Sequence, residues 1–73
     1  MAYERGEYAA ALRLARPAAD QGNANAQTWI GVLYANGQGV SQDYAEALRW
    51  YRKAADQGNA TAQNNLGRLS TKR

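Results

Sequence analysis

The nine-residue stretch ADQGNANAQ at residues 19–27 occurs again as ADQGNATAQ at residues 55–63, with one residue changed. The repetition extends to both sides, because a shift of 36 residues aligns 7–33 with 43–69 and leaves 17 of those 27 positions identical. Internal periods of roughly 20 to 50 residues are typical of stacked repeats, in which each unit buries its apolar face on the next. The sequence therefore predicts a repeat protein.

An amphipathic helix is predicted before each copy of this stretch. Within 43–57, apolar side chains recur at the three- and four-residue spacing of one helical face, at Tyr44, Ala47, Leu48, Tyr51, Ala54 and Ala55. Asp43 and Glu46 have the spacing of a capping box, and Gly58 marks the end of the helix. Residues 7–21 repeat the pattern up to Gly22, with Pro17 inside, which should kink this helix or remove one of its hydrogen bonds.

A second type of helix is predicted to begin within each copy, directly after its Gly-Asn pair, over about 24–36 and 60–69. Asn23 and Asn59 are good N-caps for these two helices. Gly31 and Gly67 lie inside them, where glycine costs about 1 kcal/mol relative to alanine, so we expect each glycine to face a neighbouring helix at close range. The sequence thus predicts four helices, and the repeated nine residues form the tight turn between two antiparallel helices.

The composition argues against an enzyme and against a metal site. The 73 residues include no cysteine and no histidine, so the commonest metal ligands and the commonest general base are absent. Ser41 and Ser70 have no neighbouring base to activate them. The GQG at 37–39 lacks the Lys-Ser/Thr of a phosphate loop. We therefore expect no catalytic residue, no cofactor and no bound metal.

The sequence as given shows no recognisable targeting signal. It has no run of about 18 apolar residues, and the first residues, MAYERGEY, lack the apolar segment of a signal peptide. The source organism, the compartment and the oligomeric state stay unassigned, and the chain is compatible with a fragment of an exported bacterial protein.

The segment AQTWIGVLYANGQGVSQDYAEALRWYRKAADQGNA at residues 26–60 resembles a Sel1-like repeat, a relative of the tetratricopeptide repeat. The matching elements are Ala26, Ile30–Gly31, Tyr34, Gly37, Ala47–Leu48, the WYRKAA at 50–55 and Gly58. The resemblance implies an all-α solenoid of antiparallel helix pairs in a right-handed superhelix. It implies about two units in one domain over 1–73, with a partial unit at 1–24, a full unit at 25–58 and a partial unit at 59–73. It also implies a non-catalytic adaptor that binds a protein or peptide.

Candidate partner-binding residues lie on the predicted helices at 24–36 and 60–69, on the face next to the apolar side chains that are expected to pack in the core. Resemblance to tetratricopeptide grooves places ligands there, on Asn25, Thr28, Val32, Asn36, Thr61, Asn64 and Arg68. Trp29 occupies a position that is usually polar, so it is either an interface anchor or a cover for a gap in the packing. Trp50 belongs to the family's Trp-Tyr pair, and we expect it to pack between units.

The basic residues offer an alternative function. Arg13, Arg16, Arg49 and Arg52, with Lys53, fall on helical neighbours, and the chain has a net charge of +3. Such a stripe could bind nucleic acid or another anion. A solvated outer face explains the same pattern, and no exposed aromatic residue clearly alternates with the charges, so we expect nucleic acid to be an improbable partner.

Self-association is expected from the order of the helices. The first predicted helix lacks a preceding partner and the last lacks a following one, so both leave apolar surface bare. We expect this surface to pair head to tail between copies, or to close a two-fold dimer around Trp29. The residues expected in the contact are Leu12, Leu14, Leu66 and Leu69.

Overall fold

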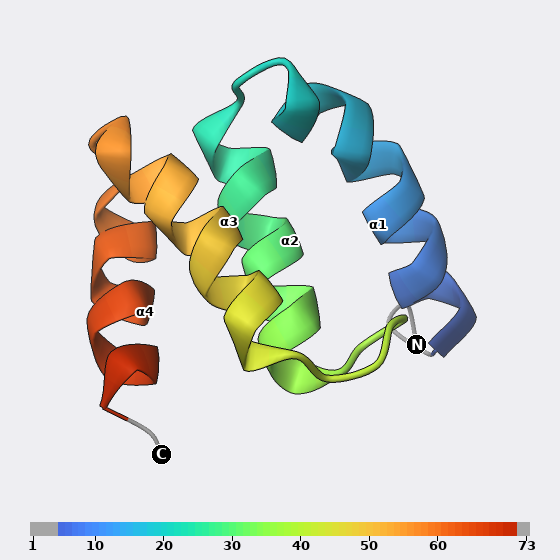
Figure 1. Ribbon diagram of the computed structural model, residues 1–73. Coiled ribbons are helices and arrows are strands. Elements are labelled where there is room, and N and C mark those ends of the chain that lie inside the picture. The colour runs from blue at the N-terminus through green and yellow to red at the C-terminus, as the bar shows by residue number, and fades with distance from the viewer. Residues whose placement is uncertain (1–4, 72–73) are drawn as a thin grey trace.

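Four α-helices make up the computed structural model, which describes residues 5–71 (Figure 1). They are α1 (Arg5–Asp20), α2 (Ala24–Asn36), α3 (Tyr44–Asp56) and α4 (Ala60–Ser70). Each helix packs mainly against its neighbours in the chain, and successive helices run antiparallel. No strand occurs within residues 5–71. The predicted all-α fold is confirmed, and every helix end lies within two residues of its expected position.

The two helix pairs are closed by the same turn. Gly22 and Gly58 adopt φ values of 101° and 90°, a left-handed backbone that ends α1 and α3. The side-chain oxygen of Asn23 then accepts a hydrogen bond from the Ala26 amide at 2.9 Å, which caps α2. Asn59 does the same for α4, at 2.8 Å from the Ala62 amide.

The last residue of the repeated stretch ties each pair together. Gln27 Nε2 donates to the Ala19 carbonyl at 3.0 Å, and Gln63 Nε2 donates to the Ala55 carbonyl at 3.3 Å. In both cases a side chain in the first turn of one helix satisfies a carbonyl at the end of the helix before it. Every polar side chain that caps or ties the turn is thus repeated, which explains why the nine residues occur twice.

The proline in α1 does not end the helix. α1 continues from Arg5 through Pro17 to Asp20, so Pro17 removes one backbone donor without terminating the helix. The capping box at the start of α3 is only half formed. Asp43 accepts from the Glu46 amide at 3.1 Å, but the Glu46 carboxylate pairs with Arg49 instead of returning to the backbone of Asp43.

Two buried clusters form the core. One joins α1, α2 and α3 through Ala19, Ile30 and Trp50, and the other joins α3 and α4 through Ala47, Tyr51 and Leu69. The first cluster spans the boundary between the two copies of the repeat, so Trp50 packs between units as expected.

Gly31 allows α2 to approach α3 closely. A Cβ atom on Gly31 would lie 2.5 Å from Cε1 of Tyr51, a distance that real side chains do not adopt. The expectation is therefore confirmed for Gly31. It is wrong for Gly67, where a Cβ atom would meet nothing within 4 Å, because no helix packs on that side of α4 in the described part of the chain.

The loop between α2 and α3 folds back onto α1 (Figure 1). Gly39, with φ 77°, lies so close to the start of α1 that an added Cβ atom would be 2.6 Å from the backbone nitrogen of Ala9. The GQG at 37–39 is therefore a structural turn that holds the two copies of the repeat together.

Replacing Gly31 with alanine should destabilise the protein by about 1–3 kcal/mol, because the added methyl group displaces the ring of Tyr51 from the core. Gly67→Ala is the matched control at the same position of the repeat. It adds its methyl group to open space and should stabilise the protein by up to about 1 kcal/mol. Urea unfolding followed by circular dichroism measures both changes. Equal changes in the two variants would contradict the close approach at Gly31.

Candidate functional site

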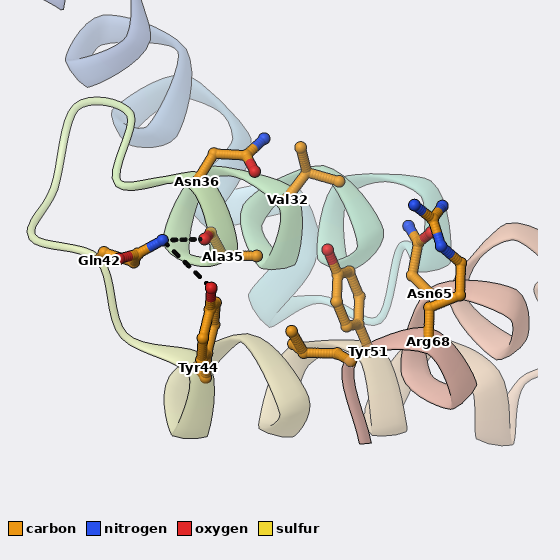
Figure 2. A pocket seen from close by; sticks show the side chains of 9 residues that line it. Val32, Ala35, Asn36, Gln42, Tyr44, Tyr51, Asn65 and Arg68 are labelled. Atoms are coloured by element: carbon orange, nitrogen blue, oxygen red, sulfur yellow. Dashed lines mark hydrogen bonds between the residues drawn. The ribbon is translucent and has the colours of Figure 1, made fainter. Parts of the chain in front are cut away.

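A groove of about 450 Å³ opens between α2 and α4, with α3 along its floor (Figure 2). Its lining comes from α2, from the loop before α3, from α3 and from α4. The lining residues are Val32, Ala35, Asn36, Gln42, Tyr44, Tyr51, Asn65, Arg68 and Leu69. A volume of this size holds a few side chains of a ligand rather than a folded domain.

The floor of the groove is formed by the second core cluster and by the side chains that pack on it. Leu69 is 8% exposed and packs with Tyr51, while Val32 and Ala35 lean on the same cluster from α2. A side chain that enters the groove therefore meets apolar atoms of these residues together with the hydroxyl of Tyr51 (Figure 2).

The rim is polar and carries a cation. Arg68 and Asn65 lie side by side on α4, and Asn36 lies across from them on α2 (Figure 2). Arg68 forms no ion pair within residues 5–71, so its guanidinium donors are available to a ligand. The amide of Asn36 donates to Gln38 Oε1 at 3.4 Å and keeps its own oxygen free to accept.

Tyr51 connects the core to the groove. Burial raises the pKa of its hydroxyl above the ordinary value of 10.0, and the positive charge of Arg68 partly offsets that rise. The charge of Arg68 on α4 is therefore felt at the floor of the groove, on α3.

Gln42 shapes the end of the groove near the loop. Its Nε2 donates to the Ala35 carbonyl at 2.8 Å and lies 3.5 Å from the hydroxyl of Tyr44 (Figure 2). These contacts hold the ring of Tyr44, which is 42% exposed, at the mouth of the groove.

Three of the predicted partner-binding residues, Val32, Asn36 and Arg68, meet in this groove. Three others are exposed but lie outside its lining, namely Asn25, Thr61 and Asn64. Asn25 accepts a hydrogen bond from the side chain of Asn59 at 3.0 Å. Thr28 is only 7% exposed and its hydroxyl donates to the Ala24 carbonyl, so it offers a partner almost no side-chain surface.

Trp29 is 36% exposed on α2. The shift of 36 residues relates it to Asn65, which lines the groove on α4. Trp29 therefore occupies on α2 the position that Asn65 has on α4.

Sequence reasoning missed most of the groove's floor and its loop end, namely Ala35, Gln42, Tyr44, Tyr51, Asn65 and Leu69. The apolar spacing of α3 assigned Tyr44 and Tyr51 to the core, and Tyr51 is indeed buried. The only indication of a second role was the polar hydroxyl at the end of each ring.

The arginines of the basic stripe have different surroundings. Arg16 lies 3.9 Å from Asp20 and 5.6 Å from the ring centroid of Trp50, and Arg49 pairs with Glu46 at 3.2 Å. Lys53 lies 5.0 Å from the same Trp50 centroid. Arg13 and Arg52 are exposed and form no ion pair in the described part of the chain.

The four leucines expected in self-association also differ. Leu12 packs within the chain against the first core cluster, and Leu69 is buried in the second. Leu66 is half-buried at the edge of that second cluster. Leu14 is 78% exposed and presents the most surface to another molecule, whereas Leu12 and Leu66 are both half-buried.

Within residues 5–71, no group of His, Cys, Asp or Glu side chains is arranged to hold a metal ion. No helix in this range combines the length and the apolar character that crossing a bilayer requires.

Comparison with known proteins finds the same architecture. The family model for the Sel1 repeat matches residues 1–23 and 24–59. A Sel1 repeat protein from Oxalobacter formigenes, known from its crystal structure, has 43% sequence identity to this chain. The two structures match with a TM-score of 0.81, and the match covers 84% of this chain. This chain spans about a quarter (25%) of the length of that protein. Comparison with curated proteins gave no match.

Replacing Arg68 with glutamine should raise the pKa of Tyr51 further, because the cation that stabilises the tyrosinate is removed. The pH dependence of tyrosinate absorbance measures this shift, and Tyr51→Phe identifies the transition that belongs to Tyr51. Arg52→Gln is the matched control, because Arg52 is an exposed arginine that does not perturb Tyr51. An unchanged Tyr51 pKa in Arg68→Gln would contradict the placement of the guanidinium at the groove.

The raised pKa also sets a stability change at alkaline pH. Because the folded-state pKa of Tyr51 lies above the unfolded value of 10.0, the folded chain holds this proton more tightly. The resulting stability is fully present below pH 10 and is lost as the pH rises through the folded-state pKa. Urea unfolding at several alkaline pH values should show this decline, and Tyr51→Phe should reduce it.

Proposed function

Because the chain belongs to the Sel1 repeat family, we propose that it is a non-catalytic adaptor module that binds a protein segment in the groove between α2 and α4. Sel1 repeats typically mediate protein–protein interaction, and proteins built from them are generally non-catalytic scaffolds. The observation that carries the choice of surface is a groove with apolar side chains on its floor, beside an arginine, Arg68, that forms no ion pair within residues 5–71.

The shape of the groove favours an extended segment. It is open to solvent along its length, and single apolar side chains of a ligand would pack beside Val32 and Leu69. Amides on both sides, Asn36 and Asn65, can bond the backbone of a strand-like peptide, since each carries both donors and acceptors.

The charge of the groove favours a carboxylate in that segment. Arg68 is the cation among the nine lining residues, and no acidic residue is among them. A guanidinium forms two parallel hydrogen bonds with a carboxylate, which adds directionality to the charge attraction. We infer that the preferred partner carries an acidic side chain or a free C-terminus next to an apolar residue.

Four predicted partner-binding residues outside the groove are also exposed. Trp29 supplies an exposed aromatic ring on α2, and large aromatic residues are common anchors at interfaces. Asn25, Thr61 and Asn64 supply exposed polar groups near the starts of α2 and α4. We propose that Trp29 and these residues contact parts of the partner beyond the groove, without a contribution from the buried Thr28.

The alternative, an anion or nucleic-acid binder using the arginine stripe, has less support. Arg16 and Arg49 already have intramolecular partners, and Arg16 also lies over an aromatic ring. Only Arg13 and Arg52 of the four arginines are unpaired within residues 5–71. Two free cations neutralise few phosphates, so binding to nucleic acid should be no tighter than non-specific at physiological salt.

The proposal is tested with short synthetic peptides that share one sequence except for a central acidic, neutral or basic residue. Fluorescence anisotropy of labelled peptides should show that the acidic peptide binds best. Arg68→Glu should weaken that binding by at least about tenfold, because it leaves two like charges in the groove. Arg52→Glu is the control: it makes the same charge change on an exposed face of α3 outside the groove.

Three results would count against this function. Equal binding by wild type and Arg68→Glu would remove the groove as the site, and preference for the basic peptide would reverse the proposed chemistry. Sub-micromolar binding of a labelled oligonucleotide that weakens steeply with salt, and is lost in Arg49→Ala with Arg52→Ala, would favour the alternative.

A further inference from the structure

Equivalent residues of the two repeats differ sharply in burial. Trp50 on α3 is 5% exposed, whereas Leu14, the equivalent residue on α1, is 78% exposed. Ala54 is completely buried, whereas its equivalent Ala18 is exposed. The two helices have similar sequences, so the difference lies in what packs on them: α2 covers this face of α3, and no helix within residues 5–71 covers it on α1.

The same contrast holds at the other end of the molecule. Ile30 on α2 is completely buried, because it lies in one cluster with Trp50. Its equivalent on α4, Leu66, remains half-exposed, and the space beside Gly67 is open. α4 therefore presents the surface that α2 buries, and α1 presents the surface that α3 buries.

We propose that α1 of one copy of this chain packs on α4 of a second copy, in the register in which α3 packs on α2. The internal contact supplies the template, because both faces of the new contact are repeats of faces that already fit each other. In this register Leu14 of one copy lies against Leu66 and Ala55 of the other, as Trp50 lies with Ile30 and Ala19 inside each chain. The contact is head-to-tail, since the two faces differ.

The residues that differ between the repeats make this contact weaker than the internal one. On α4 and at its C-cap, Arg68, Ser70 and Thr71 replace the apolar Val32, Tyr34 and Ala35 of α2. The ring of Tyr51 packs on Gly31 inside the chain, but its equivalent on α1 is the much smaller Ala15. In the proposed contact, the space beside Gly67 would therefore stay partly empty. Association should therefore depend on concentration instead of being permanent.

Arg52 gains a role in this register. Inside the chain, Arg16 lies over the ring of Trp50 at 5.6 Å from the centroid. Arg52 is the equivalent of Arg16 one repeat later, and it is exposed and unpaired within residues 5–71. It would lie over residue 14 of the second copy, so Leu14→Trp should restore a cation–π contact and strengthen association by about tenfold.

Two variants block one end each and leave the fold intact. Leu14→Glu puts a charge on the α1 face at a site that is already exposed, and Gly67→Leu fills open space on the α4 face. Each variant alone should lose association by at least about tenfold, because apolar contact is replaced by a buried charge or a steric block. The controls are Ala45→Glu on α3 and Asn65→Leu on α4, which make similar changes on other faces.

Sedimentation equilibrium across a hundredfold concentration range decides the outcome. The wild type should rise above the chain mass of 8.0 kDa, and each blocked variant should stay at that mass. An equimolar mixture of the two blocked variants should form a dimer and stop there, because each keeps the end that the other lacks. Circular dichroism at low concentration checks that both variants are folded.

Three outcomes would overturn the proposal. The wild type could remain at 8.0 kDa throughout, which would leave these faces to some other protein. Leu14→Glu could dissociate while Gly67→Leu does not, which would indicate a two-fold contact between α1 helices. The mixture could stay monomeric although the wild type associates, which would place the contact elsewhere. None of these results depends on peptide binding in the groove.

Discussion

The contact between Gly31 and the ring of Tyr51 determines both the packing and the groove. Because Gly31 has no side chain, the ring lies directly against α2, which brings α3 close and buries the ring in the core. The hydroxyl of the same tyrosine reaches the groove floor, where it feels the charge of Arg68. One residue therefore belongs to the core and to the binding surface, so a change in the packing of α2 on α3 alters the groove as well.

Trp50 shows how the boundary between repeats is built from unlike interactions. Its ring is buried with Ala19 and Ile30, and the cations of Arg16 and Lys53 lie over it. Its Nε1 is buried and has no acceptor within residues 5–71, which costs about 1–3 kcal/mol. Cation–π contacts of about 0.5–1 kcal/mol each offset part of that cost. The arginines that suggest an anion-binding stripe thus include one that stabilises this boundary.

The sequence predicted most features that depend on neighbours along the chain, but only some of those that a spatial neighbour decides. The helix ends, the caps at Asn23 and Asn59 and the turn at Gly22 were predictable because each is a local backbone requirement. Gly67 has the same position in the repeat as Gly31, but no atom of another helix within the described residues lies close to it. Periodicity assigned Tyr51 to the core without showing that a groove ends at its hydroxyl, since that depends on where α4 lies.

Packing mainly between successive helices makes this a nearly one-dimensional structure. Its free energy of unfolding is approximately the sum of an intrinsic term for each helix pair and a coupling term for each boundary between pairs, as in a linear lattice of interacting sites. The cluster around Trp50 belongs to the coupling term, because it joins α1 and α2 of one pair to α3 of the next. A substitution that weakens this cluster lowers the cooperativity of unfolding while the helices themselves persist. The two helix pairs then unfold in separate steps, and the apparent free energy of unfolding depends less steeply on denaturant concentration.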